Sequence, residues 1–157
     1  MIYVFDTSSF SPLKHFYPDV FVSMWSGLDD LYQAKQLIST REAWKELERG
    51  NPDQHVNKWL TPRKDLFLTP TTAEMQFVAQ IFSVPHFHKL IGDKQRLNGW
   101  PVADPFLIAC AKIHGGTLVT EEQAKPNSPK IPNVCSHFGI PCINLNTFMQ
   151  QQGWSFC

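Results

Sequence analysis

The sequence predicts an α/β fold in which a mainly parallel sheet is covered by helices on both faces. Segments with strand-like and helix-like patterns alternate along the chain, as they do in proteins of this class. The strand-like segments are apolar and lack the alternating polar residues of a sheet that faces water. The length of 157 residues and a hydrophobic content of 43% indicate one packed domain, which we assign to residues 1–157.

The first third of the chain contains two short strands and two helices. Residues 2–5 are expected to form a buried strand, which ends directly before Asp6. Residues 21–37 carry apolar side chains at spacings of three and four, which indicates an amphipathic helix. The segment LIST, residues 37–40, is expected to be a second strand, and residues 41–50 the next helix.

The middle of the chain is mainly helical. We expect a helix over residues 53–65, an unclassified segment at 66–70, a helix over 71–84, and a short helix with a loop over 86–98. Pro62 should break the first of these helices, because it lacks the backbone N–H of a helix interior. Thr71 or Thr72 is expected to be the N-cap of the helix that follows.

The most regular helix is predicted at residues 103–116. Asp104 precedes Pro105, a favourable pair for an N-cap and a first-turn residue, and Gly115 and Gly116 should end the helix. Further elements are then expected in this order: a strand at 117–120, a polar loop at 121–133, a helix at 134–140, a strand at 141–145 and a helix at 146–153.

Composition restricts the possible functions. Lys plus Arg and Asp plus Glu each number 14, so any nucleic-acid site must be a local basic patch. We expect no signal peptide and no membrane span, since the only apolar run at the start is interrupted by Asp6 and no run of about 18 apolar residues exists. The four cysteines follow neither zinc-site nor C-x-x-C spacing, which indicates reduced thiols in a cytoplasmic protein.

Four carboxylates stand at the ends or starts of predicted elements: Asp6, Glu46, Asp104 and Glu122. Ligands of open α/β sheets gather beyond the carboxyl ends of the strands, where Asp6 and Glu122 are expected. Clustered acids favour a bound cation, and oxygen ligands select Mg²⁺ or Mn²⁺ over zinc. The alternatives are helix capping for Asp6 and Asp104, and an ordinary exposed position for Glu46.

The sequence also resembles a known family. The segments YVFDTSS, ISTREAWKELERG, VADPFLIACAK and TLVTEE resemble, in this order, the four motifs of the PIN-domain family. That family is a three-layer α/β/α sandwich of metal-dependent ribonucleases, and it includes toxins of bacterial toxin–antitoxin pairs. The resemblance extends over nearly the whole chain and implies a single PIN-like domain that hydrolyses RNA with Mg²⁺ or Mn²⁺.

The same resemblance implies roles for individual residues. Catalytic and metal-ligand roles are implied for four acids: Asp6, Glu46, Asp104 and Glu122. Substrate-binding roles are implied for three hydroxyl residues: Thr7, Ser8 and Thr120. The commonest fourth motif has Asp where Glu122 stands, so either the longer Glu122 or its neighbour Glu121 would have to reach the metal.

Basic residues near these motifs could hold RNA by its phosphates. Arg41, Lys45 and Arg49 recur at spacings of four, which predicts one helix face beside Glu46. Further candidates are Arg63, Lys64, Lys89, Lys94 and Arg96. Toxins of the PIN family usually form homodimers and are inhibited by an antitoxin, which would be a separate protein here.

Two other functions remain open at this point. One is a PIN-like fold without catalysis that binds protein or RNA. The other is a phosphatase built on Asp6, which the sequence favours less because Ser8 occupies the position of the usual second acid.

Overall fold

A computed structural model describes residues 1–91 and 102–157 of the chain. Its centre is a five-stranded sheet with the order β3-β2-β1-β4-β5, in which every pairing is parallel. The strands are β1 (Tyr3–Phe5), β2 (Leu37–Thr40), β3 (Phe67–Leu68), β4 (Thr117–Val119) and β5 (Cys142–Ile143). The unclassified segment at 66–70 therefore contains an edge strand.

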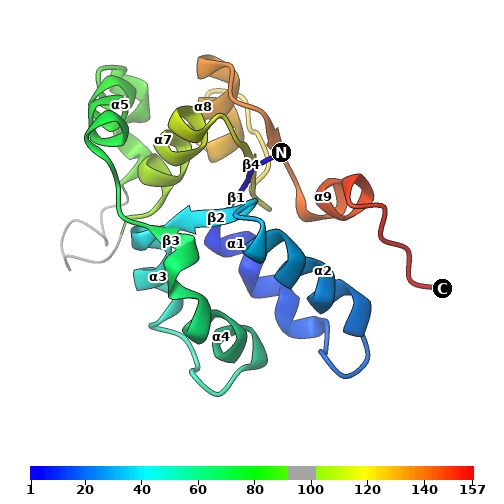
Figure 1. Cartoon of the computed structure of the whole chain (residues 1–157). Coiled ribbons are helices and arrows are strands. Elements are labelled where there is room, and N and C mark those ends of the chain that lie inside the picture. The colour runs from blue at the N-terminus through cyan, green and yellow to red at the C-terminus, as the bar shows by residue number, and fades with distance from the viewer. Residues whose placement is uncertain (92–101) are drawn as a thin grey trace.

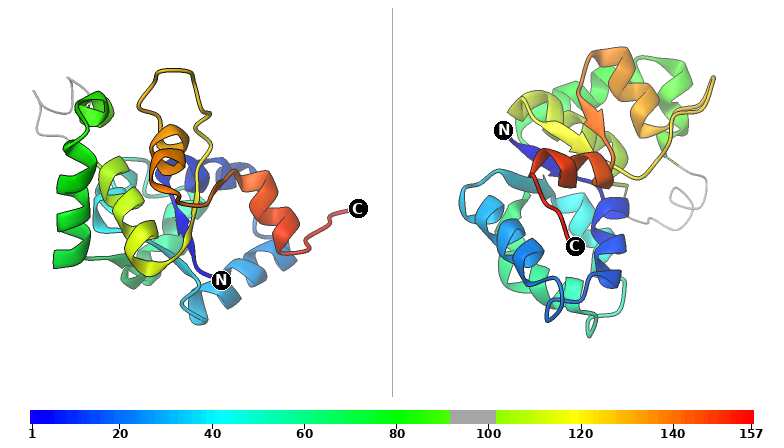
Figure 2. Two further views of the ribbon diagram at one scale, coloured as in Figure 1. Left: turned by 90° about the horizontal axis from the view of Figure 1, so that it is seen from above. Right: turned by 90° about the vertical axis from the view of Figure 1, so that its right-hand side faces the viewer.

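Helices cover both faces of this sheet, which confirms the predicted three-layer α/β/α architecture (Figures 1 and 2). One layer contains α1 (Thr7–Phe10), η1 (Ser11–His15), α2 (Val22–Gln33), α3 (Arg41–Leu47), α4 (His55–Leu60), η2 (Thr61–Leu66) and α9 (Leu145–Gln151). The opposite layer contains α5 (Thr72–Phe82), η3 (Pro85–Leu90), α7 (Asp104–His114) and α8 (Ile131–Phe138).

The central strand β1 fixes the core because its side chains alternate between the two layers. Tyr3 and Phe5 point toward α9, where each ring lies 4.9 Å from that of Phe148 in an edge-to-face arrangement. On the opposite face, a Cβ at Gly116 would lie 3.3 Å from a Val4 methyl carbon and 3.1 Å from the Ile2 carbonyl oxygen. Close approach of α7 and β4 to β1 therefore requires a residue without a side chain at position 116.

The start of α7 differs from the prediction. Ala103, not Asp104, occupies the N-cap position, and Asp104 is the first helical residue. The first turn closes one residue earlier than expected because the Leu107 N–H donates to the Ala103 carbonyl at 2.9 Å. Pro105 lies in the first turn, as predicted. Asp104 is an acidic residue of the first turn and not the N-cap.

One boundary predicted from proline is confirmed, and another differs from the prediction. The α-helix predicted over 53–65 is broken at Pro62: α4 ends at Leu60, Pro62 lies in the first turn of the 3-10 helix η2, and the chain is kinked at Arg63. Helix α8 begins at Ile131, three residues earlier than predicted, with Pro132 in its first turn.

Thr71 is the N-cap of α5, with a capping box to Glu74. Within the described ranges, no helix has the length and apolar character needed to cross a membrane.

Candidate functional site

Asp6 directly follows β1 at the carboxyl edge of the sheet, and only 4% of its surface is exposed. Its Oδ2 atom accepts hydrogen bonds from the hydroxyls of Ser8, at 2.7 Å, and Thr120, at 2.8 Å. Asp6 occupies the N-cap position of α1 without a side-chain hydrogen bond of capping geometry, and the nearby N–H groups of Thr7 and Ser8 lower its pKa. Burial raises the pKa of Asp6, and the two hydroxyl bonds oppose this effect.

Backbone N–H groups orient the two hydroxyls that hold Asp6. The N–H of Glu121 donates to Ser8 Oγ at 3.0 Å, and the N–H of Glu122 donates to Thr120 Oγ1 at 3.1 Å. Because each hydroxyl oxygen accepts one of these bonds, its own proton is directed at the Asp6 carboxylate. This network joins the ends of β1 and β4 and fixes one carboxylate of the candidate site.

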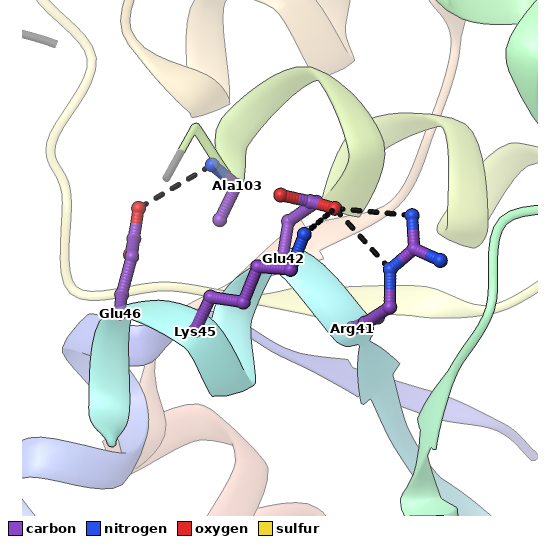
Figure 3. Close-up of polar contacts among 5 residues, drawn as sticks. All are labelled: Arg41, Glu42, Lys45, Glu46 and Ala103. Atoms are coloured by element: carbon purple, nitrogen blue, oxygen red, sulfur yellow. Dashed lines mark hydrogen bonds and ion pairs between the residues drawn. The ribbon is translucent and has the colours of Figure 1, made fainter. Parts of the chain in front are cut away.

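Glu46 lies on α3, in the next element along the same edge. Its Oε2 accepts a hydrogen bond from the Thr7 hydroxyl at 2.8 Å, and its Oε1 accepts one from the Ala103 N–H at 3.3 Å (Figure 3). Glu46 therefore links the starts of α1 and α7. Burial raises the pKa of Glu46, and the negative charge of Asp6 adds to that increase.

The carboxylate of Asp104 lies in the field of the other three acids. Burial and the charges of Asp6, Glu122 and Glu46 raise its pKa from 3.8 to about 8, and Lys130 opposes this shift. Among the described residues, no hydrogen-bond donor reaches this carboxylate. The structure thus gathers the four predicted acids closely enough for three of them to act electrostatically on Asp104.

The two candidates for the fourth acid both accept hydrogen bonds from helix N-termini. Glu121 Oε1 accepts from the Leu145 N–H of α9 at 2.6 Å, and Glu122 Oε2 accepts from the Ile131 N–H of α8 at 2.9 Å. Such bonds satisfy N–H groups that have no partner within the helix. Glu122 is among the charges that raise the pKa of Asp104, which favours it over Glu121 as the fourth acid.

The donor set fits a hard divalent cation in type and charge. The four side chains offer only carboxylate oxygens, which are the ligands that Mg²⁺ and Mn²⁺ prefer. Their spacing is wider than that of a formed metal site. Among the described residues, one group of three potential ligands has its donor atoms within 4.8 Å of one another, and it is Glu74, Cys110 and His114. The acids would therefore have to move inward to bind a cation.

The three hydroxyl residues predicted to bind substrate donate hydrogen bonds to the acids. Thr7 donates to Glu46, and Ser8 and Thr120 donate to Asp6, so all three position the acids. The sequence motifs located them at the site but did not reveal these pairings, because Thr120 lies 114 residues from Asp6 in the chain.

The predicted basic face beside Glu46 is only partly formed. Arg41 and Lys45 lie on α3, and both pair with Glu42, at 3.3 Å and 3.2 Å (Figure 3). Helix α3 ends at Leu47, so the expectation that Arg49 shares the helix face is wrong. The side chains of Arg41 and Lys45 are 49% and 45% exposed, which leaves them accessible to a phosphate.

Of the other basic candidates, Lys64 places its ammonium 5.3 Å from the centre of the Trp44 ring, and Lys89 is exposed on η3. Arg63 is held by the fold, since it pairs with Asp29 at 3.0 Å and its guanidinium carbon lies 4.4 Å from the centre of the Trp59 ring. Its engagement in the fold argues against a role in RNA binding. Lys94 and Arg96 lie outside the described residues.

Comparison with known proteins places the chain in a family. The sequence model of a family described as "Domain of unknown function (DUF4411)" matches residues 3–156. The chain belongs to this family. No curated protein matches the sequence. Among solved structures, the crystal structure of PAE2754 from Pyrobaculum aerophilum is similar, with 15% sequence identity and a TM-score of 0.48 over 96% of this chain and 88% of that chain.

In this DUF4411 protein two pockets lie beside acids of the site. Thr7 and Glu46 line a pocket of about 160 Å³ that also contains Lys14. Thr120 and Glu122 line a second pocket, of about 250 Å³. The two pockets are lined by different site residues.

Two cations near the acids were not predicted from the sequence. Lys14 shares the first pocket with Glu46, and the charge of Lys130 acts on Asp104. Lys14 lies on η1 and Lys130 directly precedes α8, and neither belongs to a motif that would have identified it. No ion pair between described residues joins either lysine to an acid of the site.

Proposed function

We propose that this DUF4411 protein is a Mg²⁺- or Mn²⁺-dependent endoribonuclease with a PIN-like active site at the carboxyl edge of its sheet. The observation that carries the proposal is the position of Asp104. Its carboxylate has no hydrogen-bond donor among the described residues, and it lies in the field of three further acids. A half-buried carboxylate close to like charges is destabilising unless a proton or a cation compensates its charge.

The chain's own residues would hold a cation in a defined orientation. Asp6 and Glu46 are fixed by hydroxyl and backbone donors, whereas Asp104 is unconstrained by hydrogen bonds among the described residues. When bound, the cation would lower the pKa of water and stabilise negative charge on a phosphoryl group. Arg41 and Lys45, which are exposed on the helix that carries Glu46, would contact phosphates of the RNA.

An RNA-cleavage assay tests the proposal. The full chain is incubated with a fluorescently labelled structured RNA in Mn²⁺, with a chelator as the metal-free reference. We expect cleavage by the wild type and none by Asp6→Ala or Asp104→Ala. Asp53→Ala is the matched control, since Asp53 is exposed and is neither one of the four acids nor a residue that lines the two pockets. Cleavage by both site variants at the rate of the control would remove these residues from catalysis.

A second candidate function is a PIN-like module that binds RNA or protein without cleaving it. The observation that favours it is the wide spacing of the four acids compared with the group formed by Glu74, Cys110 and His114. The two functions differ in their response to metal. A module without catalysis would bind the labelled RNA equally in Mn²⁺ and in chelator, and would leave it intact.

The proposal includes a biological role as the toxin of a bacterial toxin–antitoxin pair, acting in the cytoplasm. Its support is the four-motif resemblance to PIN-domain proteins. A separate antitoxin would inhibit the nuclease, and an Arg or Lys of that partner would compete with the cation for the same negative charge. We further propose a homodimer, which sedimentation of the purified chain would test.

A further inference from the structure

Three side chains that could bind a metal meet between α5 and α7, away from the carboxyl-edge acids. Glu74 lies in the first turn of α5, and Cys110 and His114 lie four residues apart on α7 and so share one helix face. One donor atom from each lies within 4.8 Å of the others. Glu74 is 1% exposed, and Cys110 is fully buried.

The hydrogen bonds of this group leave one atom without a partner. Glu74 Oε2 accepts the N–H of Thr71 at 2.8 Å as part of the capping box. His114 Nε2 lies 3.9 Å from the same oxygen, which is too long for a hydrogen bond. This nitrogen is buried and has no hydrogen-bond partner among the described residues. A buried unpaired polar atom in a folded protein requires a specific explanation.

We propose that Glu74, Cys110 and His114 form a site for a transition-metal ion of the Zn²⁺ class. A carboxylate oxygen, a thiolate and an imidazole nitrogen together select zinc-like ions over Mg²⁺. In a tetrahedral zinc site, oxygen and nitrogen ligands are separated by about 3.3 Å. The distance of 3.9 Å between His114 Nε2 and Glu74 Oε2 needs only a small contraction to reach this value.

A cavity beside His114 would give an ion access to the proposed site. His114 lines a cavity of about 420 Å³ that also contains Tyr32 and Asp65. Three protein ligands with an open fourth position are typical of zinc sites that bind water or a small ligand. The cavity would allow the ion to enter and a water molecule to complete its coordination.

The proposed zinc-class site is separate from the carboxyl-edge acids. Asp104 and His114 are the first and last residues of α7, so their backbones lie about 15 Å apart. The two sites also differ in ligand type, since the four acids offer carboxylates and the other group offers the Cys110 thiol and the His114 imidazole. Either site can therefore fail a test without affecting the conclusion about the other.

A metal-free explanation accounts for part of the same geometry. The Cys110 thiol can donate a hydrogen bond to Glu74. That bond satisfies the thiol but leaves His114 Nε2 without a partner among the described residues. A metal would engage all three side chains, which is the reason to prefer it.

Cobalt titration tests this site directly. The full chain is stripped with a chelator and titrated with Co²⁺, which replaces zinc and produces a charge-transfer absorption band when bound to a thiolate. We expect a band that saturates at one Co²⁺ per chain and disappears when Zn²⁺ is added. Cys142 lies near Asp6 and Glu122 at the carboxyl edge, so Cys142→Ala, which should retain the band, excludes Co²⁺ bound there as its source.

Matched variants identify the ligands. Cys110→Ala should abolish the band, and Cys135→Ala, at a buried cysteine outside the group, should retain it. His114→Gln should weaken Co²⁺ binding at least about tenfold, whereas His137→Gln should not. Circular dichroism checks folding, and His114→Gln decides the question if Cys110→Ala does not fold. Absence of the band from the wild type, or its full retention in Cys110→Ala or in His114→Gln, would overturn the proposal.

Discussion

Replacing Asp104 with asparagine should stabilise the metal-free protein at about pH 7. The folded state raises the pKa of Asp104 from 3.8 to about 8. Between these two pH values Asp104 is therefore protonated in the folded protein and ionised in the unfolded chain. Stability therefore falls as the pH rises through this window, by about 1.4 kcal/mol per pH unit. Asparagine keeps the shape of the side chain and removes this penalty.

The magnitude follows from the same pKa shift. At about pH 7 the penalty on wild-type Asp104 is at most about 4 kcal/mol, because the window from 3.8 to 7 covers about three pH units. The amide introduced by Asp104→Asn would also be half-buried without a known donor or acceptor, which costs about 1–3 kcal/mol. We expect a net gain of about 1–3 kcal/mol near pH 7, and no gain near pH 4, where the folded-state aspartate is protonated.

Urea unfolding in a chelator provides the assay, performed at about pH 4 and pH 7 for the wild type, Asp104→Asn and the control Asp53→Asn. The urea midpoint of Asp104→Asn minus that of the wild type should be larger at about pH 7 than at about pH 4. The control should show no such difference, since Asp53 is exposed. An Asp104→Asn effect equal to that of the control at both pH values would refute the electrostatic description of the site.

Three further predictions concern the network, the core and the proposed role. Thr120→Val removes a hydroxyl that lowers the pKa of Asp6, so the pKa of Asp6 should rise. Calorimetric titration should then show Mn²⁺ affinity at least about tenfold lower than that of the wild type. Thr120→Ser keeps the hydroxyl and should keep the wild-type affinity. Phe148→Ala should cost about 3–5 kcal/mol in urea unfolding, because the ring is fully buried against Tyr3 and Phe5. Expression of the wild type alone in a bacterium should slow growth and amino-acid incorporation, and Asp6→Asn should not; equal growth at equal protein levels would count against the toxin role.

The architecture was predictable from the sequence because its strong signals are local. The run of apolar residues before Asp6 identified β1, and its lack of alternation indicated a sheet covered on both faces. The position of Asp6 at the carboxyl edge then followed from the parallel topology. The edge strand β3 was missed because its two residues, Phe67 and Leu68, carry too little pattern to classify.

The sequence predictions at the site were wrong where the same local pattern is compatible with more than one position of a helix end. Asp104 before Pro105 fits an N-cap, but it also fits the first helical residue, which is its actual position. The spacing of Arg49 from Lys45 fits a helix face, but α3 ends before Arg49. These alternatives differ by one or two residues at a helix end, and such ends are set by tertiary contacts such as the bond from the Ala103 N–H to Glu46.

The group of Glu74, Cys110 and His114 could be only half predicted. The spacing of four between Cys110 and His114 places them on one helix face, which is visible in the sequence. Glu74 reaches them only because α5 packs against α7. No local sequence pattern indicates that α5 packs against α7, so Glu74 could be identified as the third ligand only from the structure.

A thermal titration with Mn²⁺ tests the central claim most directly, namely that the carboxyl-edge acids bind a divalent cation. The melting temperature of the full chain is measured with increasing Mn²⁺ for the wild type and for the double variant Asp6→Asn with Asp104→Asn. Binding to the folded state alone raises stability by about 2.7 kcal/mol at one hundred times the dissociation constant. We predict that Mn²⁺ raises the melting temperature of the wild type and leaves that of the double variant unchanged. An equal increase in both proteins would contradict the claim.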